Sequence, residues 1–378
     1  MTNGEKIRVL VADDSAFMRK VLVSILDSDG TFEVVGEARD GRETVEKAAK
    51  LKPHVITMDI NMPHMDGLQA TEVIMSTDPR PILIVSSESK DGADATLRAL
   101  ELGAIDFVAK PSSGIDLDMS SVREELVRKL RIASKVRVIR NLMRSASATS
   151  ARLDPPPTDS AAKPPSNGTF NGASNGSLNG TRLSVAVLAA STGGPATLMK
   201  LIRDFAPSFP AALLVVQHMP GTFTPQFAEQ LAAVSQNPVK QAENGELLRA
   251  GQVYVCPGDC HLRVAPPGRI VLDDGPRIGG YRPSIDVTLE SVAALAGGNA
   301  VAAILTGMGN DGARGVMAIQ ENGGLVLAQD EATSVIFGMP AEAIRTGAVA
   351  QVLPLEQIAA AITRRVANHF GSARMVAL

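Results

Sequence analysis

Residues 54–67 read HVITMDINMPHMDG, an apolar run that ends in an acid and continues into a loop containing proline and glycine. A short apolar run bounded by such a loop indicates a buried strand. Similar runs precede and follow it: IRVLVAD at 7–13, FEVVGEA at 32–38, PILIVSS at 81–87 and DFVAK at 106–110. Stretches with the apolar spacing of helices separate these runs. This alternation predicts an α/β domain with a five-stranded parallel sheet of the flavodoxin-like type.

The second half of the chain repeats the alternation. Its apolar runs are LSVAVLAAS at 183–191, AALLVVQH at 211–218, AVAAILTG at 300–307 and LVLAQD at 325–330. This half is therefore predicted to be a doubly wound, Rossmann-like α/β domain. Between the halves the chain has almost no large apolar residues and repeats Asn-Gly, so it cannot offset its ordering entropy by burial. We expect domains at 1–143 and 183–378, joined by a flexible disordered linker at 144–182.

The composition excludes several classes of function. The 378-residue chain is 45% hydrophobic and 20% charged, with a formal net charge of −3 and no Trp. A slightly acidic chain that is poor in aromatic residues argues against nucleic-acid binding. No apolar stretch reaches the roughly 18 residues of a membrane span, and only two cysteines occur. We therefore expect a cytoplasmic protein without direct membrane insertion. We also expect it to be a monomer.

Polar side chains follow the strands of the first half at the edge where ligands gather in parallel sheets. They are Asp13 and Asp14 after the first run, Asp59 after the third, Ser86 and Ser87 at the end of the fourth, and Lys110 at the end of the fifth. Acids at this spacing repel one another unless a cation joins them, and all-oxygen ligation suits Mg²⁺. Helix capping by Asp14 or Ser15 is the alternative explanation for a single acid at a strand end.

The same set of side chains fits phosphoryl transfer. Asp59 would act as the nucleophile and form an aspartyl phosphate, while Lys110 would pair with the phosphoryl oxygens. Ser86 would hydrogen-bond a phosphoryl oxygen only after modification, which provides the differential contact that a two-state switch needs.

The phrases VADDSAFMRK, MDINMPHMDG and FVAKP resemble the response-regulator receiver family over residues 6–130. The resemblance implies that Asp59 is the phosphoacceptor and that a sensor histidine kinase is the phosphodonor. It also implies that Asp13, Asp14, Asp59 and the Asn61 carbonyl bind Mg²⁺, that Ser86 and Phe107 form the switch pair, and that the Lys110–Pro111 bond is cis. Many receivers have Thr and Tyr at the switch positions, so the size of the switch is open.

A second set of polar residues follows strands of the second half. Ser191 precedes a Thr-Gly-Gly-Pro turn, His218 ends the next apolar run, and Asp311 follows AVAAILTG. A serine, a histidine and an acid at one sheet edge indicate a serine hydrolase, with backbone N–H groups near the Gly307–Asn310 loop for an oxyanion. Alternatives remain: Ser191 as a cap or phosphate-binding residue, His218 as an ordinary hydrogen-bonding residue, and Asp286 as a rival acid or a cap.

The phrases AASTGGP, VVQHMP, VYVCPGDCHL, RPSIDV and LTGMGNDGA resemble the catalytic domain of the chemotaxis protein-glutamate methylesterases over about 183–368. The resemblance implies a triad of Ser191, His218 and Asp311, with the Met308 N–H in the oxyanion hole. It also implies hydrolysis of glutamyl methyl esters, and deamidation of glutamines, on chemoreceptor helices. The receiver would cover this site until Asp59 is phosphorylated. No cofactor is expected in the catalytic domain.

Three features are left with open interpretations. Cys256, Cys260 and His261 offer too few ligands, at atypical spacing, for structural zinc. Residues 123–144 form a basic amphipathic stretch that either ends the receiver as a solvated helix or docks on the catalytic domain or on acidic receptor helices. Two competing functions remain. One is a signalling module that binds without catalysis, and the other is the same enzyme acting on receptors that control an output other than motility.

Overall fold

The structure is a computed structural model, and it describes residues 6–87, 89–110, 119–136 and 183–375. Two α/β regions lie on either side of the segment 137–182. The predicted linker at 144–182 and the Lys110–Pro111 bond lie outside the described residues, so those expectations stay predictions. Among the described residues, no helix combines the length and the apolar character that a membrane crossing needs.

The first region is built on a five-stranded parallel sheet with the order β2-β1-β3-β4-β5. The strands are β1 (Ile7–Ala12), β2 (Phe32–Ala38), β3 (Val55–Met58), β4 (Ile82–Ser86) and β5 (Asp106–Ala109). The helices are α1 (Ala16–Asp29), α2 (Gly41–Leu51), α3 (Gly67–Thr77), α4 (Lys90–Glu101) and α5 (Met119–Ala133). This strand order is that of the flavodoxin-like fold, as predicted.

Helices cover both faces of this sheet, which explains why its strands are apolar throughout. Successive residues of β1 point to opposite faces. Val9 packs in one buried cluster with Leu26 of α1 and Leu130 of α5. Leu10 packs in another with Ile74 of α3 and Leu97 of α4.

The second region contains a seven-stranded sheet, wholly parallel, with the order β14-β13-β12-β6-β7-β9-β8. Its strands are β6 (Val185–Ala190), β7 (Ala212–Gln217), β8 (Val239–Gln241), β9 (Val253–Val255), β12 (Ala300–Ile304), β13 (Leu325–Gln329) and β14 (Gln351–Leu353). Strands β10 (His261–Ala265) and β11 (Arg269–Asp273) form a separate antiparallel hairpin that packs on α8.

Helices lie on both faces of the larger sheet as well. The elements are α6 (Gly194–Leu201), η1 (Ile202–Asp204), α7 (Thr224–Val234), α8 (Ile285–Ala296), η2 (Gly297–Asn299), α9 (Ala313–Glu321), α10 (Met339–Arg345) and α11 (Leu355–Met375). One buried cluster holds Leu198 of α6 and Ile358 of α11. The other holds Leu289 of α8 and Val316 of α9. The predicted doubly wound, Rossmann-like architecture is confirmed.

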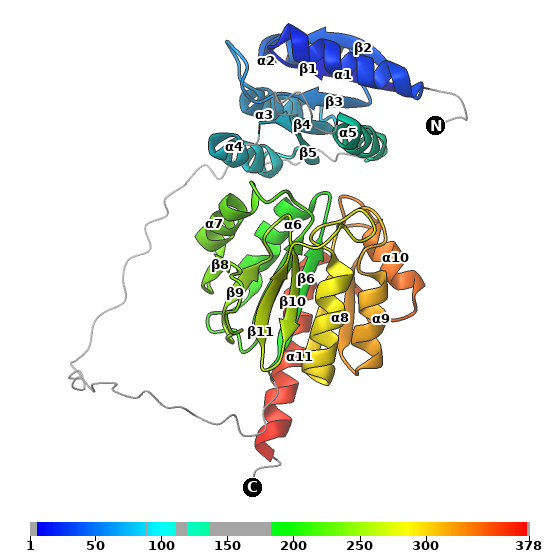
Figure 1. The fold of residues 1–378 in the computed structure, drawn as a ribbon. Helices are drawn as coiled ribbons and strands as arrows, with labels where there is room; N and C mark the ends of the chain where they lie inside the picture. The colour runs from blue at the N-terminus through cyan, green and yellow to red at the C-terminus, as the bar shows by residue number, and fades with distance from the viewer. Residues whose placement is uncertain (1–5, 88, 111–118, 137–182, 376–378) are drawn as a thin grey trace, which may run out of the picture.

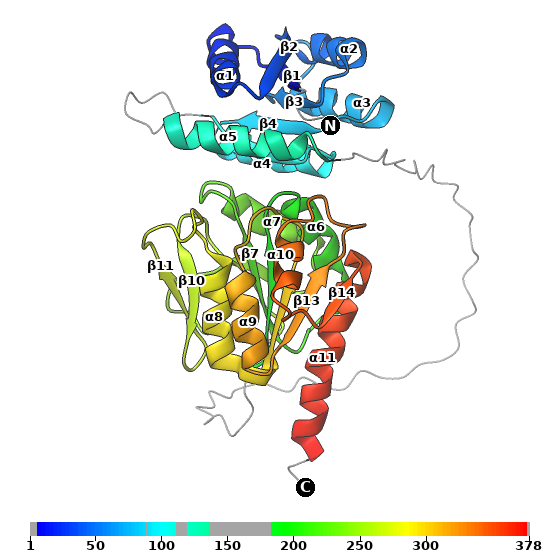
Figure 2. The same cartoon turned by 90° about the vertical axis from the view of Figure 1, so that its right-hand side faces the viewer.

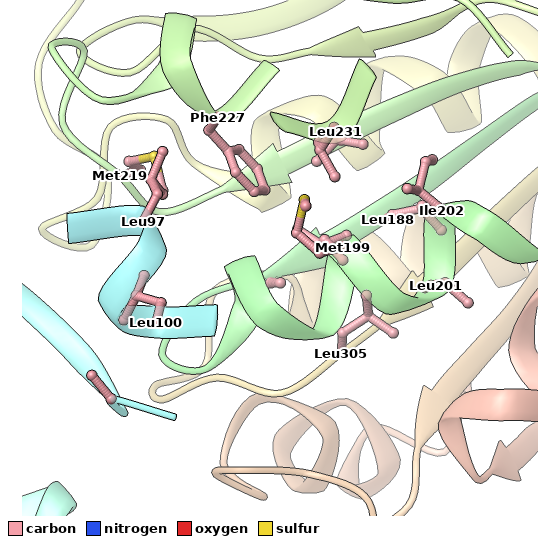
Figure 3. Packing of buried hydrophobic residues seen from close by; sticks show 14 of the residues in the cluster. Leu97, Leu100, Leu188, Met199, Leu201, Ile202, Met219, Phe227, Leu231 and Leu305 are labelled. Carbon is pink, nitrogen blue, oxygen red and sulfur yellow. The ribbon is translucent and has the colours of Figure 1, made fainter. Parts of the chain in front are cut away.

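The two regions pack directly on each other. Figures 1 and 2 show α4, β5 and α5 facing the end of the second region where α6 and α7 begin. Helix α4 contacts both α6 and α7. Figure 3 shows Leu97 of α4 beside Met219, which lies just beyond β7, and both belong to one buried apolar cluster that spans the two regions. The carboxyl edge of the larger sheet is therefore covered by the smaller domain.

Candidate active site

An acidic cluster lies at the carboxyl edge of the five-stranded sheet. Asp13 directly follows β1 and Asp59 directly follows β3. One carboxylate oxygen each from Asp13, Asp14 and Asp59 lie within 4.8 Å of one another. The Ser15 N–H donates to Asp13 Oδ1 at 2.9 Å, and the Ile60 N–H donates to Asp59 Oδ1 at 2.8 Å. These bonds fix two of the carboxylates in a set of hard oxygen ligands that suits Mg²⁺.

Lys110 joins two of these acids. Its Nζ lies 2.9 Å from Asp59 Oδ2 and 2.9 Å from Asp13 Oδ2. The contact with Asp13 Oδ2 is an ion pair without hydrogen-bonding geometry, so this buried oxygen keeps acceptor capacity for a cation. Burial raises the pKa of the Asp59 carboxyl, with a further contribution from Asp13, and the opposing effect of Lys110 does not cancel the rise. Asp59 is therefore a buried acid whose negative charge is incompletely compensated.

The remaining predicted receiver residues lie around this cluster. Ser86 is buried, and its hydroxyl donates to the Gly92 carbonyl of α4 at 3.3 Å. Phe107 of β5 is buried as well, and it packs against Phe223 of the second domain. Asn61 is exposed two residues after Asp59, and its role as a carbonyl ligand stays a prediction. Ser15, rather than Asp14, caps α1, because its hydroxyl accepts from the Met18 N–H at 3.3 Å.

Ser191 follows β6 in a turn that only glycine can complete. Gly193 has φ 76°, in the left-handed region, and is the N-cap of α6. A Cβ on Gly194 would lie 2.0 Å from Gln217 Oε1. The Ser191 N–H donates to the Thr306 carbonyl at 3.0 Å, and its carbonyl accepts from Gln217 Nε2 at 2.9 Å. Strand, turn and helix thus hold the serine at the carboxyl edge of the sheet, near the N-terminus of α6.

His218 and Asp311 form a close pair at the same edge. His218 Nε2 lies 2.8 Å from Asp311 Oδ2. His218 Nδ1 is buried and has no hydrogen-bond partner, so the Ser191 hydroxyl does not donate to it in this arrangement. The pair is therefore assembled, while its link to the serine is not.

Asp311 is held as an anion by the start of α8. It accepts hydrogen bonds from the Ser284 hydroxyl at 2.9 Å and from the N–H groups of Ile285 and Asp286 at 2.7 and 3.0 Å. Burial acts to raise the pKa of Asp311, but the hydrogen bonds and charge of His218 and these backbone donors hold it below its usual value. An acid in this state keeps its charge near neutral pH.

Asp286 performs the corresponding task for α9. Its Oδ1 accepts from the N–H groups of Gly312 and Gly315 at 2.9 and 2.8 Å, and its Oδ2 lies 3.1 Å from Arg314 Nε. Asp311 therefore lies at the N-terminus of α8 and Asp286 at the N-terminus of α9, where negative charge is stabilised. This geometry favours the cap interpretation of Asp286 over its role as a rival acid.

Met308 lies in a tight turn that Gly307 fixes. A Cβ on Gly307 would lie 2.8 Å from Ser191 Cβ and 2.4 Å from Met339 Sδ. The turn therefore approaches the serine closely, as an oxyanion-binding loop requires. The role of the Met308 N–H itself stays a prediction.

Contacts between the domains meet next to the serine. The Thr192 hydroxyl donates to Asp106 Oδ2 at 2.6 Å, and this bond is buried. The Phe107 and Phe223 rings pack with centroids 4.4 Å apart. Arg128 Nη1 of α5 lies 3.4 Å from Met308 Sδ. Helix α5 thus ends the receiver, with Leu126 and Leu130 in its core, and also touches the catalytic domain through Arg128.

Sequence reasoning missed Asp106, Thr192 and Tyr281. Asp106 also binds Lys129, whose Nζ lies 3.1 Å from Asp106 Oδ1 and 5.2 Å from the Phe107 ring centroid. Thr192 directly follows the predicted nucleophile, and Tyr281 directly precedes the RPSIDV motif. The available signals were their positions, with Thr192 inside the AASTGGP motif and Asp106 and Tyr281 each directly before one. Their contacts join segments far apart in the sequence, which no local pattern reveals.

The cysteine segment is structural in its contacts. Both cysteines are free, and burial raises the pKa of each thiol. His261 Nδ1 accepts from the Ser284 N–H at 3.1 Å, and His261 Nε2 lies 3.0 Å from the Pro276 carbonyl. Both ring nitrogens are therefore engaged, which argues against the metal site that the sequence already disfavoured.

A receiver-type acidic site coupled to a parallel sheet with serine, histidine and acid at its covered edge defines a response regulator with a hydrolase output. Residues 9–120 match the response regulator receiver domain, and residues 186–362 match CheB methylesterase. These matches account for both folded regions.

Relatives match over nearly the whole chain. A protein-glutamate methylesterase/protein-glutamine glutaminase of Pyrococcus abyssi is 43% identical over 373 residues, covering 96% of this chain and 94% of the relative. One of Symbiobacterium thermophilum is 44% identical over 360 residues, covering 95% and 97%. The solved catalytic domain of Thermotoga maritima CheB methylesterase is 40% identical, with a TM-score of 0.47, and covers 49% of this chain and 99% of that one.

The chain belongs to the protein-glutamate methylesterase/protein-glutamine glutaminase family. The full-length relatives at 43–44% identity carry this conclusion. The predicted family and the predicted class of enzyme are confirmed.

Proposed function

We propose that this protein is a phosphorylation-activated serine hydrolase that demethylates glutamyl methyl esters, and deamidates glutamines, on the cytoplasmic helices of chemoreceptors. The observation that carries this proposal is the His218–Asp311 pair, 2.8 Å apart, at the sheet edge that also bears Ser191. Such a trio serves nucleophilic acyl transfer and has no use in a domain that only binds. Demethylation of this kind provides adaptation in bacterial chemotaxis.

The chemistry follows from the orientation of the imidazole. Nε2 faces Asp311, so Nδ1 is the nitrogen left to accept the Ser191 proton. The serine oxygen attacks the ester carbonyl, and the Met308 N–H stabilises the resulting oxyanion. The C–O bond to methanol then breaks as His218 returns the proton to the leaving oxygen, and water repeats the sequence on the acyl-enzyme. Asp311 keeps the imidazole in the required tautomer.

The receiver acts as a cover that is held by a polar bond, an aromatic pair and a shared apolar cluster. A hydrogen bond to a charged group, as between Thr192 and Asp106, contributes about 1.5–3 kcal/mol. An aromatic pair such as Phe107 and Phe223 contributes about 0.5–1.5 kcal/mol beyond area burial. Loss of these contacts would change the population of the covered state by roughly one to three orders of magnitude. A rearrangement of β5 and α4 that breaks these contacts would therefore shift the population toward the open state.

Phosphorylation of Asp59 by a sensor histidine kinase is the proposed trigger. Asp13, Asp14, Asp59 and the Asn61 carbonyl would hold Mg²⁺, which neutralises charge on the phosphoryl group when bound. Lys110 would move from its two carboxylates toward the phosphoryl oxygens. Ser86 would leave the Gly92 carbonyl of α4 to bind the phosphoryl group, and this change would release α4 and Phe107 from the catalytic domain.

We also propose a cytoplasmic location and a monomeric state. Two free cysteines support a reducing compartment. The methylated receptors and the kinase are the proposed partners, and nucleic acid is not one. The domain boundaries at 143 and 183 belong to this proposal.

Methanol release from a methylated receptor fragment tests the hydrolase directly. In Ser191→Ala we expect the rate to fall by at least about 10³-fold, because a triad without its nucleophile retains only the residual catalysis of binding and the oxyanion hole. Ser208→Ala is a matched control, since Ser208 is exposed and lies before β7, at the opposite edge of the sheet. Normal methanol release by Ser191→Ala would refute the mechanism.

A further inference from the structure

Tyr281 occupies a rigid turn that leads into the start of α8. Ile278 and Tyr281 exchange two backbone hydrogen bonds of 3.0 Å each. Between them, Gly279 and Gly280 have φ 60° and 88°, a left-handed conformation that glycine adopts without strain. The backbone that carries the tyrosine is therefore fixed by its own turn, independently of the other domain.

The Tyr281 ring covers one face of the His218 imidazole. Their centroids lie 4.2 Å apart, and the ring planes are inclined by only 13°. An imidazole stacked in this way cannot rotate about its Cβ–Cγ bond without losing the contact. The stack adds a second restraint to the Asp311 hydrogen bond, which fixes only one edge of the ring.

The far end of the same tyrosine touches the turn that carries Met308. A Cβ added to Gly309 would lie 2.3 Å from the Tyr281 hydroxyl oxygen, and Gly309 has φ 97°. The ring therefore extends from the imidazole to the turn with the proposed oxyanion donor. Burial raises the pKa of Tyr281, so the phenol stays neutral and is not a base near neutral pH.

One short segment thus organises both members of the His–Asp pair. Tyr281 stacks on the imidazole, and three to five residues later Ser284, Ile285 and Asp286 donate hydrogen bonds to the Asp311 carboxylate. We propose that Tyr281 is a positioning residue for the hydrolase, which sets the orientation of His218 relative to Ser191 and to the Met308 turn. This proposal rests on the proposed function of the triad.

Its position predicts a specific pattern of kinetic effects. Misplacing a catalytic base by about 1 Å lowers the rate of the chemical step by up to about 10²-fold. Substrate binding should be little affected, because Tyr281 acts through His218. Tyr281→Leu should therefore lower kcat by about 10- to 100-fold and change KM by less than about twofold. Tyr281→Phe retains the stack and should keep kcat within about threefold of wild type.

The experiment measures kcat and KM for methanol release from a methylated receptor fragment by the full chain, with and without acetyl phosphate and Mg²⁺. Tyr281 also lies near Arg128 of the receiver, whose charge acts on it. A positioning role lowers kcat by the same factor in both states, whereas a role in the domain interface changes only the ratio between them. Leu247→Ala, at a side chain that is 45% exposed, is the control for an unrelated apolar truncation.

Three results would overturn the proposal. They are a kcat for Tyr281→Leu within twofold of wild type, a loss confined to KM, or an equal loss in the Leu and Phe variants. Thermal unfolding of each variant separates these results from simple misfolding. Failure of the proposed function is distinguishable, because it would appear in parallel as normal methanol release by Ser191→Ala, whatever residue 281 is.

Discussion

Asp59 and Asp311 are both buried acids beyond strands of parallel sheets, yet their surroundings shift their pKa values in opposite directions. Burial raises the pKa of Asp59, which has Lys110 as its cation and Asp13 as a neighbouring acid. Burial acts on Asp311 as well, but His218 and the backbone donors of α8 outweigh it and lower the pKa. The Asp59 site compensates negative charge only in part, and the Asp311 site stabilises it.

This difference matches two kinds of chemistry. An acid that takes a phosphoryl group must bring a cation to its site and lose its own charge, and Asp59 has surroundings that favour both. An acid that orients a histidine must remain an anion throughout the reaction. Burial alone therefore does not identify the role of an aspartate. The donors around it do.

The largest effect on kcat is expected from removing the negative charge of Asp311. Asp311→Asn should lower kcat by about 10⁴-fold, because an amide no longer favours the tautomer that leaves Nδ1 free to accept a proton. Steady-state methanol release measures this loss. Asp273→Asn, at a partly exposed acid of β11, is the control. A loss below tenfold would remove Asp311 from the triad.

A smaller effect is expected from replacing Asp59, the proposed phosphoacceptor, and it concerns activation by a phosphodonor. In Asp59→Asn, acetyl phosphate with Mg²⁺ should no longer raise methanol release, while wild type should respond by about tenfold or more. The rate without phosphodonor should stay close to that of wild type, because Asp59 does not touch the catalytic domain. A full response in the variant would place the phosphorylation site elsewhere.

Weakening the hydrogen bond between Thr192 and Asp106, which joins the two domains, should raise the rate several-fold instead of lowering it. Asp106→Asn weakens the charge-assisted bond from Thr192, so the rate without phosphodonor should rise by roughly three- to tenfold. Glu125→Gln is the matched control, since it removes an ion pair with Lys129 but leaves the Thr192 bond intact. If both variants behave alike, the Lys129 cluster rather than the Thr192 bond controls the cover.

The smallest effect is on stability against pH, and its sign differs between the two acids. The Asp59 pKa is raised, so the native receiver binds the extra proton and its free energy of unfolding falls as the pH rises from 3.8 through the folded pKa. The Asp311 pKa is lowered, so its stabilising contribution is present above 3.8 and is lost as the pH falls through the folded pKa.

Urea unfolding of the full chain, followed by methyl NMR signals from each domain, measures both trends. Asp59→Asn should remove the fall in the receiver, and Asp311→Asn should remove the acid-side loss in the catalytic domain. Trends of the same sign in the two domains would contradict the assignment of opposite pKa shifts.

Local pattern predicted the fold and placed Asp13, Asp59, Ser191, His218 and Asp311 at sheet edges, because parallel strands end where ligands gather. It did not predict how these residues are restrained. The hydrogen bonds of Asp286 and Asp311 join two helix starts 25 residues apart, and Tyr281, in the turn before α8, stacks on the histidine that follows β7. Such contacts depend on tertiary packing, so the spacing of residues along the chain does not predict them.

The existence of the domain interface could be predicted, but the residues that form it could not. The resemblance implied that the receiver covers the catalytic site, but it did not identify the contacts, which pair Asp106 and Phe107 of the receiver with Thr192 and Phe223 of the catalytic domain. These are common residue types, and they form the interface only because the fold brings them together from two domains.

The central claim is that phosphorylation of Asp59 controls whether Ser191 is reachable and engaged by His218. The rate at which a serine-reactive phosphonate labels Ser191 in the full chain tests this claim directly, with and without acetyl phosphate and Mg²⁺. The account predicts faster labelling of wild type with the phosphodonor and no change in Asp59→Asn. Equal labelling rates of wild type in both conditions would contradict it.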